Sequence, residues 1–184
     1  MIIDKFLWTA RALAYKPLLK NIGFPSYIGN PLNIIGYKKI SIGKNVRIYP
    51  NIRLEVHGKN SKVIIEDDVG IAQNVHITCN GKLVIGKGSV ILANVFITNI
   101  DHDYSQIDVP ILRQKQILKE TRIGENCFIG IGAAIQAGTI LGKQCIVGTN
   151  SVVRGEFPDY CVIAGNPAKI IKQYNFDTKK WERI

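Results

Sequence analysis

Residues 123–152 read IGENCF IGIGAA IQAGTI LGKQCI VGTNSV, five consecutive blocks of six residues that each open with Ile, Leu or Val. The second residue of a block is usually Gly, and the fifth is small. A period of six matches neither the 3.6-residue turn of a helix nor the two-residue alternation of a long strand. It fits a short strand plus a tight turn, so three blocks would close one triangular coil of an all-β solenoid.

The same period continues on both sides of this stretch. The other blocks open at Ile42, Ile48, Leu54, Ile65, Ile71, Ile77, Ile85, Ile91, Ile97 and Val153. Fifteen openings predict about five coils over residues 40–158, with the opening residues filling the interior and the small fifth residues packing near the corners. Cys127 and Cys145 both occupy fifth positions, 18 residues apart, which stacks them on adjacent coils. We favour packing for this pair over a redox or metal role, because the same position elsewhere holds Val, Ala, Ser or Thr.

The two ends differ from the repeat. In the lead-in, residues 1–39, apolar side chains at helical spacing between positions 2 and 20 alternate with Lys and Arg. This pattern predicts a basic amphipathic helix that stops near Pro17. A cap on the first coil is the favoured interpretation, and peripheral contact with an anionic membrane surface is the alternative. In the tail, residues 159–184, Asp177 is expected to cap a short helix that runs through Trp181.

Charge and cysteine usage restrict the class of protein. Lys and Arg outnumber Asp and Glu by 24 to 14, and a net charge of +10 attracts anionic partners without choosing among them. No basic cluster is interleaved with aromatic residues, so nucleic-acid binding is not indicated. The four cysteines lack Cys-x-x-Cys spacing, and charged residues divide the N-terminal apolar stretch. We therefore expect a cytoplasmic protein, at the inner face of the membrane if the helix binds lipid.

The repeat is interrupted once. The block at Ile97 ends at His102 and the next opens at Ile123, so residues 103–122 are predicted to protrude as a loop. The chain enters this loop through Asp101-His102-Asp103, which places one imidazole between two carboxylates. Histidine has an unperturbed pKa of about 6.5 and suits general base catalysis at neutral pH. The alternative is a surface histidine that only begins a turn.

These features resemble a known family. The blocks from Ile42 to Val153, the histidine at the loop root and the closing stretch AGNPAK at 164–169 are similar to the hexapeptide-repeat O-acetyltransferases of maltose, galactosides and polysaccharides. The resemblance covers about three quarters of the chain and implies a left-handed parallel β-helix. Asp103 stands where the sugar enzymes usually have Pro, so the chain looks more like the polysaccharide branch, including colanic-acid-type enzymes.

The resemblance also implies an activity and its residues. His102 would take the proton of a sugar hydroxyl as that oxygen attacks acetyl-CoA, in a direct transfer. Asp101 or Asp103 would orient the ring, or contact the acceptor with His76. Backbone groups of Gly130, Ile131 and Thr149 would contact CoA, and Arg154, Lys169 and Lys172 would meet its phosphates. Family sites form between subunits of a homotrimer, so a homotrimer is expected, with acetyl-CoA and a glycan as substrates.

Other functions stay open. Sugar N-acetylation is the nearest, since an amine needs less help from a base. A zinc carbonic anhydrase would use the three histidines, but His57, His76 and His102 lack the close pair expected there, so no metal is predicted. A non-enzymatic assembly subunit would not require an imidazole at the loop root.

Overall fold

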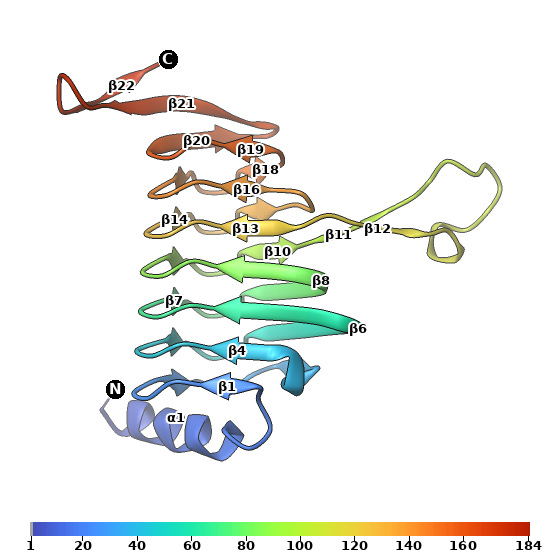
Figure 1. Ribbon diagram of the computed structural model, residues 1–184, viewed down its shortest axis with the longest axis vertical. Helices are drawn as coiled ribbons and strands as arrows, with labels where there is room; N and C mark the ends of the chain where they lie inside the picture. The colour runs from blue at the N-terminus through green and yellow to red at the C-terminus, as the bar shows by residue number, and fades with distance from the viewer. Residues whose placement is uncertain (1) are drawn as a thin grey trace.

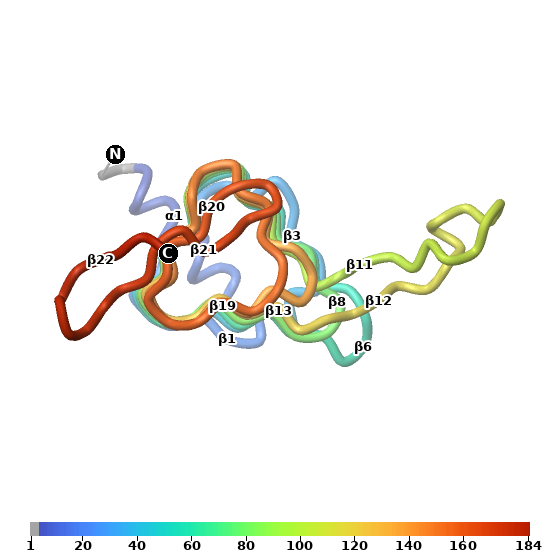
Figure 2. The backbone as a smooth tube through the Cα atoms, turned by 90° about the horizontal axis from the view of Figure 1, so that it is seen from above, coloured from blue at the N-terminus to red at the C-terminus, as the bar shows by residue number. Residues whose placement is uncertain are grey.

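The repeat folds into a stack of triangular coils. The computed structural model describes residues 2–184, with side chains from residue 4. Figure 1 shows the coils stacked along the long axis, with a helix below the first coil, an antiparallel hairpin above the last, and an arm projecting sideways. Viewed along the axis, the coils overlie one another, and the arm and the C-terminal hairpin extend furthest beyond their outline (Figure 2). The predicted parallel β-helix is therefore confirmed.

One face of the prism contains one parallel strand from each coil, so its strands give the number of coils. Its seven parallel strands are β2 (Tyr27–Ile28), β5 (Arg47–Ile48), β7 (Gly70–Ile71), β9 (Val90–Ile91), β14 (Phe128–Ile129), β17 (Ile146–Val147) and β20 (Cys161–Gly165). The structure thus has seven coils where five were predicted. An early coil uses Ile22, Ile28 and Ile34, whose spacing of six is present in the sequence, but the blocks at Ile28 and Ile34 lack the usual small fifth residue. The late coil was missed because Val153 and Phe157 are only four residues apart.

The other two faces share one ladder. Its members are β1 (Asn21–Ile22), β3 (Asn33–Ile35), β4 (Ile40–Ile42), β6 (Arg53–Ile65), β8 (His76–Ile85), β10 (Phe96–Thr98), β13 (Thr121–Ile123), β15 (Ala134–Ile135), β16 (Ile140–Leu141), β18 (Val152–Val153) and β19 (Glu156–Phe157). A short 3-10 helix, Tyr37–Lys39, precedes β4. The long strands β6 and β8 run past a corner, so each contributes to both faces.

The core consists of the block-opening residues. All fifteen predicted openings are at most 2% exposed, and so are the fifth-position residues Cys127, Ala133, Thr139, Cys145 and Ser151. Burial of a Val, Leu or Ile side chain stabilises a fold by about 1.5–3 kcal/mol. All four cysteines are buried free thiols, and Cys127 and Cys145 lie in the core as packing residues do, so packing stays the favoured role.

The N-terminal helix caps the first coil, as favoured from the sequence. Helix α1 (Ile2–Tyr15) places the Trp8 ring 5.7 Å from Tyr27 and 5.6 Å from Tyr49. Arg11 also donates a hydrogen bond from Nη1 to the carbonyl oxygen of Ile28, at 3.1 Å. None of the helices within residues 2–184 is long and apolar enough to cross a membrane.

The predicted C-terminal helix is wrong. The tail forms a hairpin of β21 (Ala168–Asn175) and β22 (Lys180–Arg183), and β21 pairs antiparallel with β20. The carboxamide oxygen of Asn175 accepts the N–H groups of Asp177 and Thr178, so Asp177 lies in a turn rather than at a helix cap. Across this turn the ring of Tyr174 packs 5.5 Å from Trp181, and such aromatic cross-strand pairs favour a hairpin.

Candidate active site

The arm predicted from the interrupted repeat is an antiparallel ribbon. It consists of β11 (Ile100–His102) and β12 (Gln116–Leu118), with a 3-10 turn, Ile111–Arg113, toward its tip. Its root is fixed by Asn99, only 1% exposed, which exchanges two hydrogen bonds of 2.8 Å with the backbone of Asn80. Asn99 also accepts the N–H of Lys119 through its carbonyl, so both strands of the arm are held at the corner where they leave the prism.

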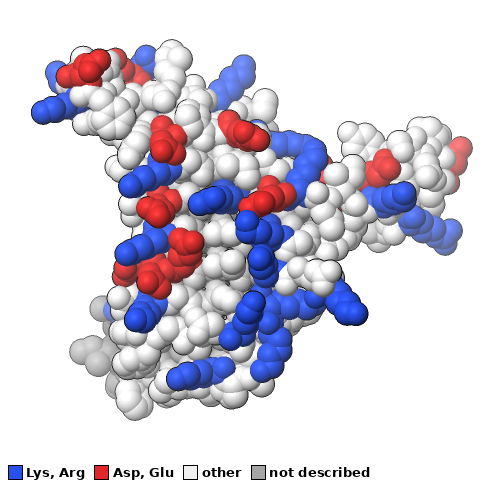
Figure 3. Space-filling view, viewed as in Figure 1, with Lys and Arg blue, Asp and Glu red and all other residues white. Residues whose placement is uncertain are grey.

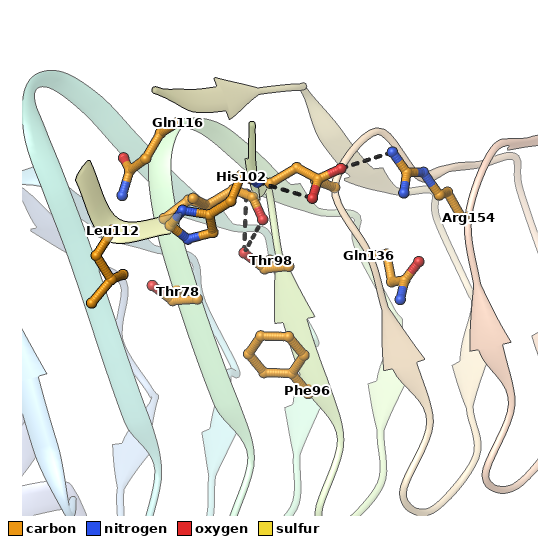
Figure 4. A pocket seen from close by; sticks show the side chains of 11 residues that line it. Thr78, Phe96, Thr98, His102, Leu112, Gln116, Gln136 and Arg154 are labelled. Carbon is orange, nitrogen blue, oxygen red and sulfur yellow. Dashed lines mark hydrogen bonds and ion pairs between the residues drawn. The ribbon is translucent and has the colours of Figure 1, made fainter. Parts of the chain in front are cut away.

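His102 is the last residue of β11 and lies opposite Gln116. It borders a hollow of about 500 Å³ between the arm and the prism face. The imidazole and the side chains of Phe96, Thr98 and Gln136 surround this space (Figure 4). The Nδ1 atom of His102 is buried and has no hydrogen-bond partner within residues 2–184. Buried polar atoms nearly always have a partner, so this nitrogen is an exception within the described chain, in a ring that borders the hollow.

The two acids beside His102 have other partners. One carboxylate oxygen of Asp101 accepts the backbone N–H of His102 at 3.0 Å, and the other lies 2.8 Å from Nη2 of Arg154. Asp103 accepts the N–H of Ser105 at 2.9 Å, and hydrogen bonds from Ser105 lower the pKa of Asp103. Neither acid contacts the imidazole in the described chain, so the orienting role stays a prediction.

His76 lies on the same prism face, one coil before Phe96. The two rings are 5.2 Å apart, and Nε2 of His76 lies 3.4 Å from the Glu55 carboxylate. Phe96 borders the His102 hollow, whereas His76 borders the next hollow along the prism. The structure therefore places His76 beside the candidate site, and its contact with an acceptor stays a prediction.

The predicted CoA-binding residues separate into three places. Gly130, Ile131 and Thr149 meet at one corner of adjacent coils, where a β-carbon on Gly130 would lie 2.6 Å from the amide nitrogen of Thr149. Lys169 and Lys172 lie on β21, at the far end of the prism. Arg154 lies apart from both groups, in the His102 hollow. Their contacts with CoA stay a prediction.

Several residues that border the hollow were not predicted. Thr78, Thr98 and Gln136 each directly follow a block-opening residue, as Arg154 does. The register carried this signal, since a residue next to a buried strand position points outward. Thr78 and Thr98 are also paired across neighbouring coils. Leu112 comes from the arm and could not be placed by register.

Positive charge gathers beside the arm. Figure 3 shows Lys and Arg side chains running down the visible face of the prism on the side of the arm, with acidic side chains along the opposite edge. Lys62 and Lys82 lie in register on β6 and β8. Such a surface raises the local concentration of anionic substrates. Within residues 2–184, no group of three or more His, Cys, Asp and Glu side chains is arranged to hold a metal ion.

A prism of six-residue blocks, with an arm that carries a histidine over its flat face, defines the hexapeptide-repeat transferases as the class of this protein. The family "Bacterial transferase hexapeptide (six repeats)" matches residues 120–155. The chain is 35% identical over 169 residues to WbbJ of Escherichia coli K12, which is named as a lipopolysaccharide biosynthesis O-acetyl transferase. These residues are 88% of this chain and 83% of WbbJ. The chain belongs to this family and is an acyltransferase, as the resemblance predicted.

Two further comparisons agree. WcaF of Escherichia coli K12, named as a colanic acid biosynthesis acetyltransferase, is 28% identical over 142 residues, which are 77% of this chain and 72% of WcaF. Among solved structures, the N-acyltransferase AntD from Bacillus cereus, in complex with dTDP and 3-hydroxybutyryl-CoA, superposes with a TM-score of 0.77. It is 20% identical, over 91% of this chain and 90% of AntD, so this likeness concerns the fold.

Proposed function

We propose that this protein transfers the acetyl group of acetyl-CoA to a sugar hydroxyl in the biosynthesis of a surface polysaccharide, such as a capsule, exopolysaccharide or lipopolysaccharide. The observation that carries the proposal is His102, held at the arm root over a hollow with an unpartnered ring nitrogen. The names of WbbJ and WcaF support acetyl transfer and a polysaccharide acceptor.

The chemistry is a direct transfer. His102 accepts the proton of the acceptor hydroxyl while that oxygen attacks the thioester carbonyl. The tetrahedral intermediate collapses, the carbon–sulfur bond breaks, and the protonated imidazole returns its proton to the CoA thiolate. No step requires a nucleophile from the protein, and the four thiols are buried in the prism. The proposed CoA contacts are backbone groups at Gly130, Ile131 and Thr149 and the side chains of Arg154, Lys169 and Lys172.

The test compares His102→Ala with a matched variant, His57→Ala, because His57 is exposed on β6 and has no part in the proposed site. Thiol release from acetyl-CoA is measured with nucleotide-linked sugars, oligosaccharides and amino sugars. We expect His102→Ala to lose at least about 100-fold in kcat/KM, and His57→Ala to match the wild type. Full activity of His102→Ala, or failure of the wild type to bind CoA, would overturn the proposal. Turnover of amino sugars alone would make the protein an N-acetyltransferase.

We further propose a homotrimer whose sites lie between subunits. Apolar side chains on the arm face solvent in a single chain, with Ile107 83% and Leu112 88% exposed, so a neighbouring subunit would cover them. Light scattering should give three chain masses for the wild type and for Phe24→Glu, which alters an exposed residue near the first coil. Ile107→Glu should dissociate the trimer, and a monomeric wild type would contradict the proposal.

Peripheral membrane contact is a separate proposal for α1. The helix packs Trp8 and Ala12 inward, while Phe6, Leu7 and Leu13 remain exposed on its outer side. Lys5 and Lys16 are also exposed and could meet anionic lipid headgroups. We expect co-sedimentation with phosphatidylglycerol vesicles, and loss of binding in Phe6→Glu/Leu13→Glu. Equal recovery with and without vesicles would rule it out.

A further inference from the structure

Outward side chains on the face that carries the candidate site form two columns. Arg53, His76 and Phe96 lie in register in one column. Glu55, Thr78 and Thr98 lie in register in the other. The neighbouring outward residues on the later coils β15 and β18 are neutral except Arg154. The pair formed by Arg53 and Glu55 is therefore an unusual feature of this face.

Glu55 is a buried carboxylate with several donors. Its side chain is only 8% exposed, and Oε1 accepts hydrogen bonds from Nε of Arg53 at 2.9 Å and from Nδ2 of Asn33 at 3.3 Å. Its other oxygen lies 3.4 Å from Nε2 of His76. Burial acts to raise the pKa of Glu55, but the hydrogen bonds from Arg53 and His76 outweigh burial and hold this pKa below its usual range. Glu55 is therefore an anion at neutral pH.

This cluster is costly if its role is only structural. Removing a carboxylate from water has a penalty that an ion pair seldom more than offsets, and an apolar pair would be at least as stable. Within residues 2–184, the other coils have no ion pair between two side chains of this face, since Arg154 pairs with Asp101 of the arm. A charged pair with perturbed ionisation beside a hollow is instead typical of a functional site.

Glu55 engages only one nitrogen atom of Arg53 and one of His76. Only Nε of Arg53 bonds to Glu55, and within residues 2–184 its two terminal amino groups make no hydrogen bond, with the side chain 48% exposed. Since Nε2 of His76 faces a carboxylate, it is the protonated nitrogen, which leaves Nδ1 as the second polar atom of the ring. Both side chains border a hollow of about 450 Å³ with Leu32, Asn51 and Asn74.

The two hollows are neighbours. His76 borders the second hollow and Phe96 borders the first. The centroids of their rings are 5.2 Å apart. Arg53 lies two coils from Phe96, which is about 10 Å at the usual strand spacing. A sugar that reacts at His102 could therefore pass the His76 and Phe96 rings and place a substituent at Arg53.

We propose that Arg53, fixed by Glu55 and flanked by His76, forms a second acceptor subsite that binds an oxyanion carried by the acceptor sugar. The oxyanion is a phosphate or a carboxylate, because the free amino groups of a guanidinium match either in a bidentate geometry. Glu55 is a positioning residue, since it acts through Arg53. The inference rests on the proposed function only for the position of the reacting hydroxyl.

The test uses the histidines as reporters. The chain has three, His57, His76 and His102, so the imidazole signals of the intact protein can be assigned with single substitutions. Glucose 1-phosphate, glucuronic acid and glucose are titrated separately, without CoA. We expect the first two to shift the His76 signal, with His57 unchanged and glucose at least about 10-fold weaker. A response to only one of the two identifies the oxyanion as phosphate or carboxylate.

Substitutions at Arg53 decide the assignment. Arg53→Gln should weaken binding of the charged sugars at least about 10-fold, whereas Arg183→Gln, with the same charge change on β22, should leave it unchanged. Arg53→Lys keeps the charge and serves if Arg53→Gln does not fold, with a smaller loss expected. Equal affinity for glucose and the charged sugars, or unchanged affinity in both Arg53 variants, would overturn the inference. Acetyl transfer to a neutral sugar without a His76 shift would overturn the subsite and leave the proposed function intact. Binding of the sugar phosphate without acetyl transfer would support the subsite and count against the proposed function.

Discussion

Arg154 and Asp101 form an ion pair of 2.8 Å that joins a late coil of the prism to the root of the arm. The two residues are 53 positions apart in the chain. The second oxygen of Asp101 accepts the backbone N–H of His102, so a side chain of β18's coil is linked through one carboxylate to the proposed base. Arg154 therefore has a structural connection to His102 in addition to the CoA contact predicted from resemblance.

Substitution of Arg154 should separate these two roles. If Arg154 positions His102 through Asp101, Arg154→Gln and Asp101→Asn should each lower kcat about 10-fold, and the double variant should be little worse than either single one. If Arg154 meets a CoA phosphate, Arg154→Gln should raise KM for acetyl-CoA while Asp101→Asn does not. Steady-state kinetics of the three variants distinguish the outcomes. Additive losses in kcat would show that the two residues act independently.

Glycine at position 124 allows close stacking of the coils. A β-carbon there would lie 2.2 Å from the carbonyl oxygen of Gly142 on the next coil, whereas one on Gly70 would meet nothing closer than 3.8 Å. We expect Gly124→Ala to reduce the free energy of unfolding by about 1–3 kcal/mol, and Gly70→Ala to be neutral or slightly stabilising. Denaturant unfolding of both variants checks this. Equal stability of the two would mean that the corner can spread without cost.

Glu55 should make stability depend on pH. The pKa of Glu55 is lowered in the folded protein. Its contribution to the free energy of unfolding is therefore fully present above the unfolded pKa of about 4.3, and is lost as the pH falls through the folded pKa. At pH 7, Glu55→Gln should therefore be less stable than wild type by about 1–2 kcal/mol. The two should converge in acid, while Glu156→Gln, at an exposed position, should follow the wild type throughout. A difference that is constant with pH would show that the charge of Glu55 does not stabilise the fold.

The four thiols should be unreactive in the folded protein. All are buried, and burial raises the pKa of the Cys79 thiol to about 12. A thiol reagent such as DTNB should modify none of them in native protein and all four after denaturation. Cys145→Ala should keep its transfer activity, because the proposed reaction uses no acyl-enzyme. Rapid labelling of one native thiol would contradict the first expectation, and inactivation by Cys145→Ala would contradict the second.

The six-residue period predicted the interior of the prism because burial in a solenoid repeats with the sequence. Ile71, Ile97 and Ile129 are completely buried, as their position in the blocks requires. The first coil could have been predicted from the same spacing at Ile22 and Ile28. The late shift before Phe157 could not, since a shortened corner leaves no periodic signal.

The candidate site was predicted in part. The break in the repeat indicated His102 and its arm, but the ion pair of Asp101 with Arg154 depends on how the arm leans on the prism. Contacts of that kind join segments that have no fixed register with each other. The hairpin at the C-terminus was missed for a similar reason, because Tyr174 and Trp181 show their partnership only when the strands are paired.

The elements at the two ends of the prism terminate the ladder of parallel strands. A stack of parallel strands exposes unpaired backbone groups at both ends, and identical molecules could add to each other there and grow into fibrils. In this protein α1 covers the first coil, and β21 pairs with the last coil in the opposite direction. The outermost strand, β22, has only four residues and carries Lys180, Glu182 and Arg183, a short charged edge that discourages further addition. The chain can therefore use a cross-β type of repeat and still remain a particle of fixed length.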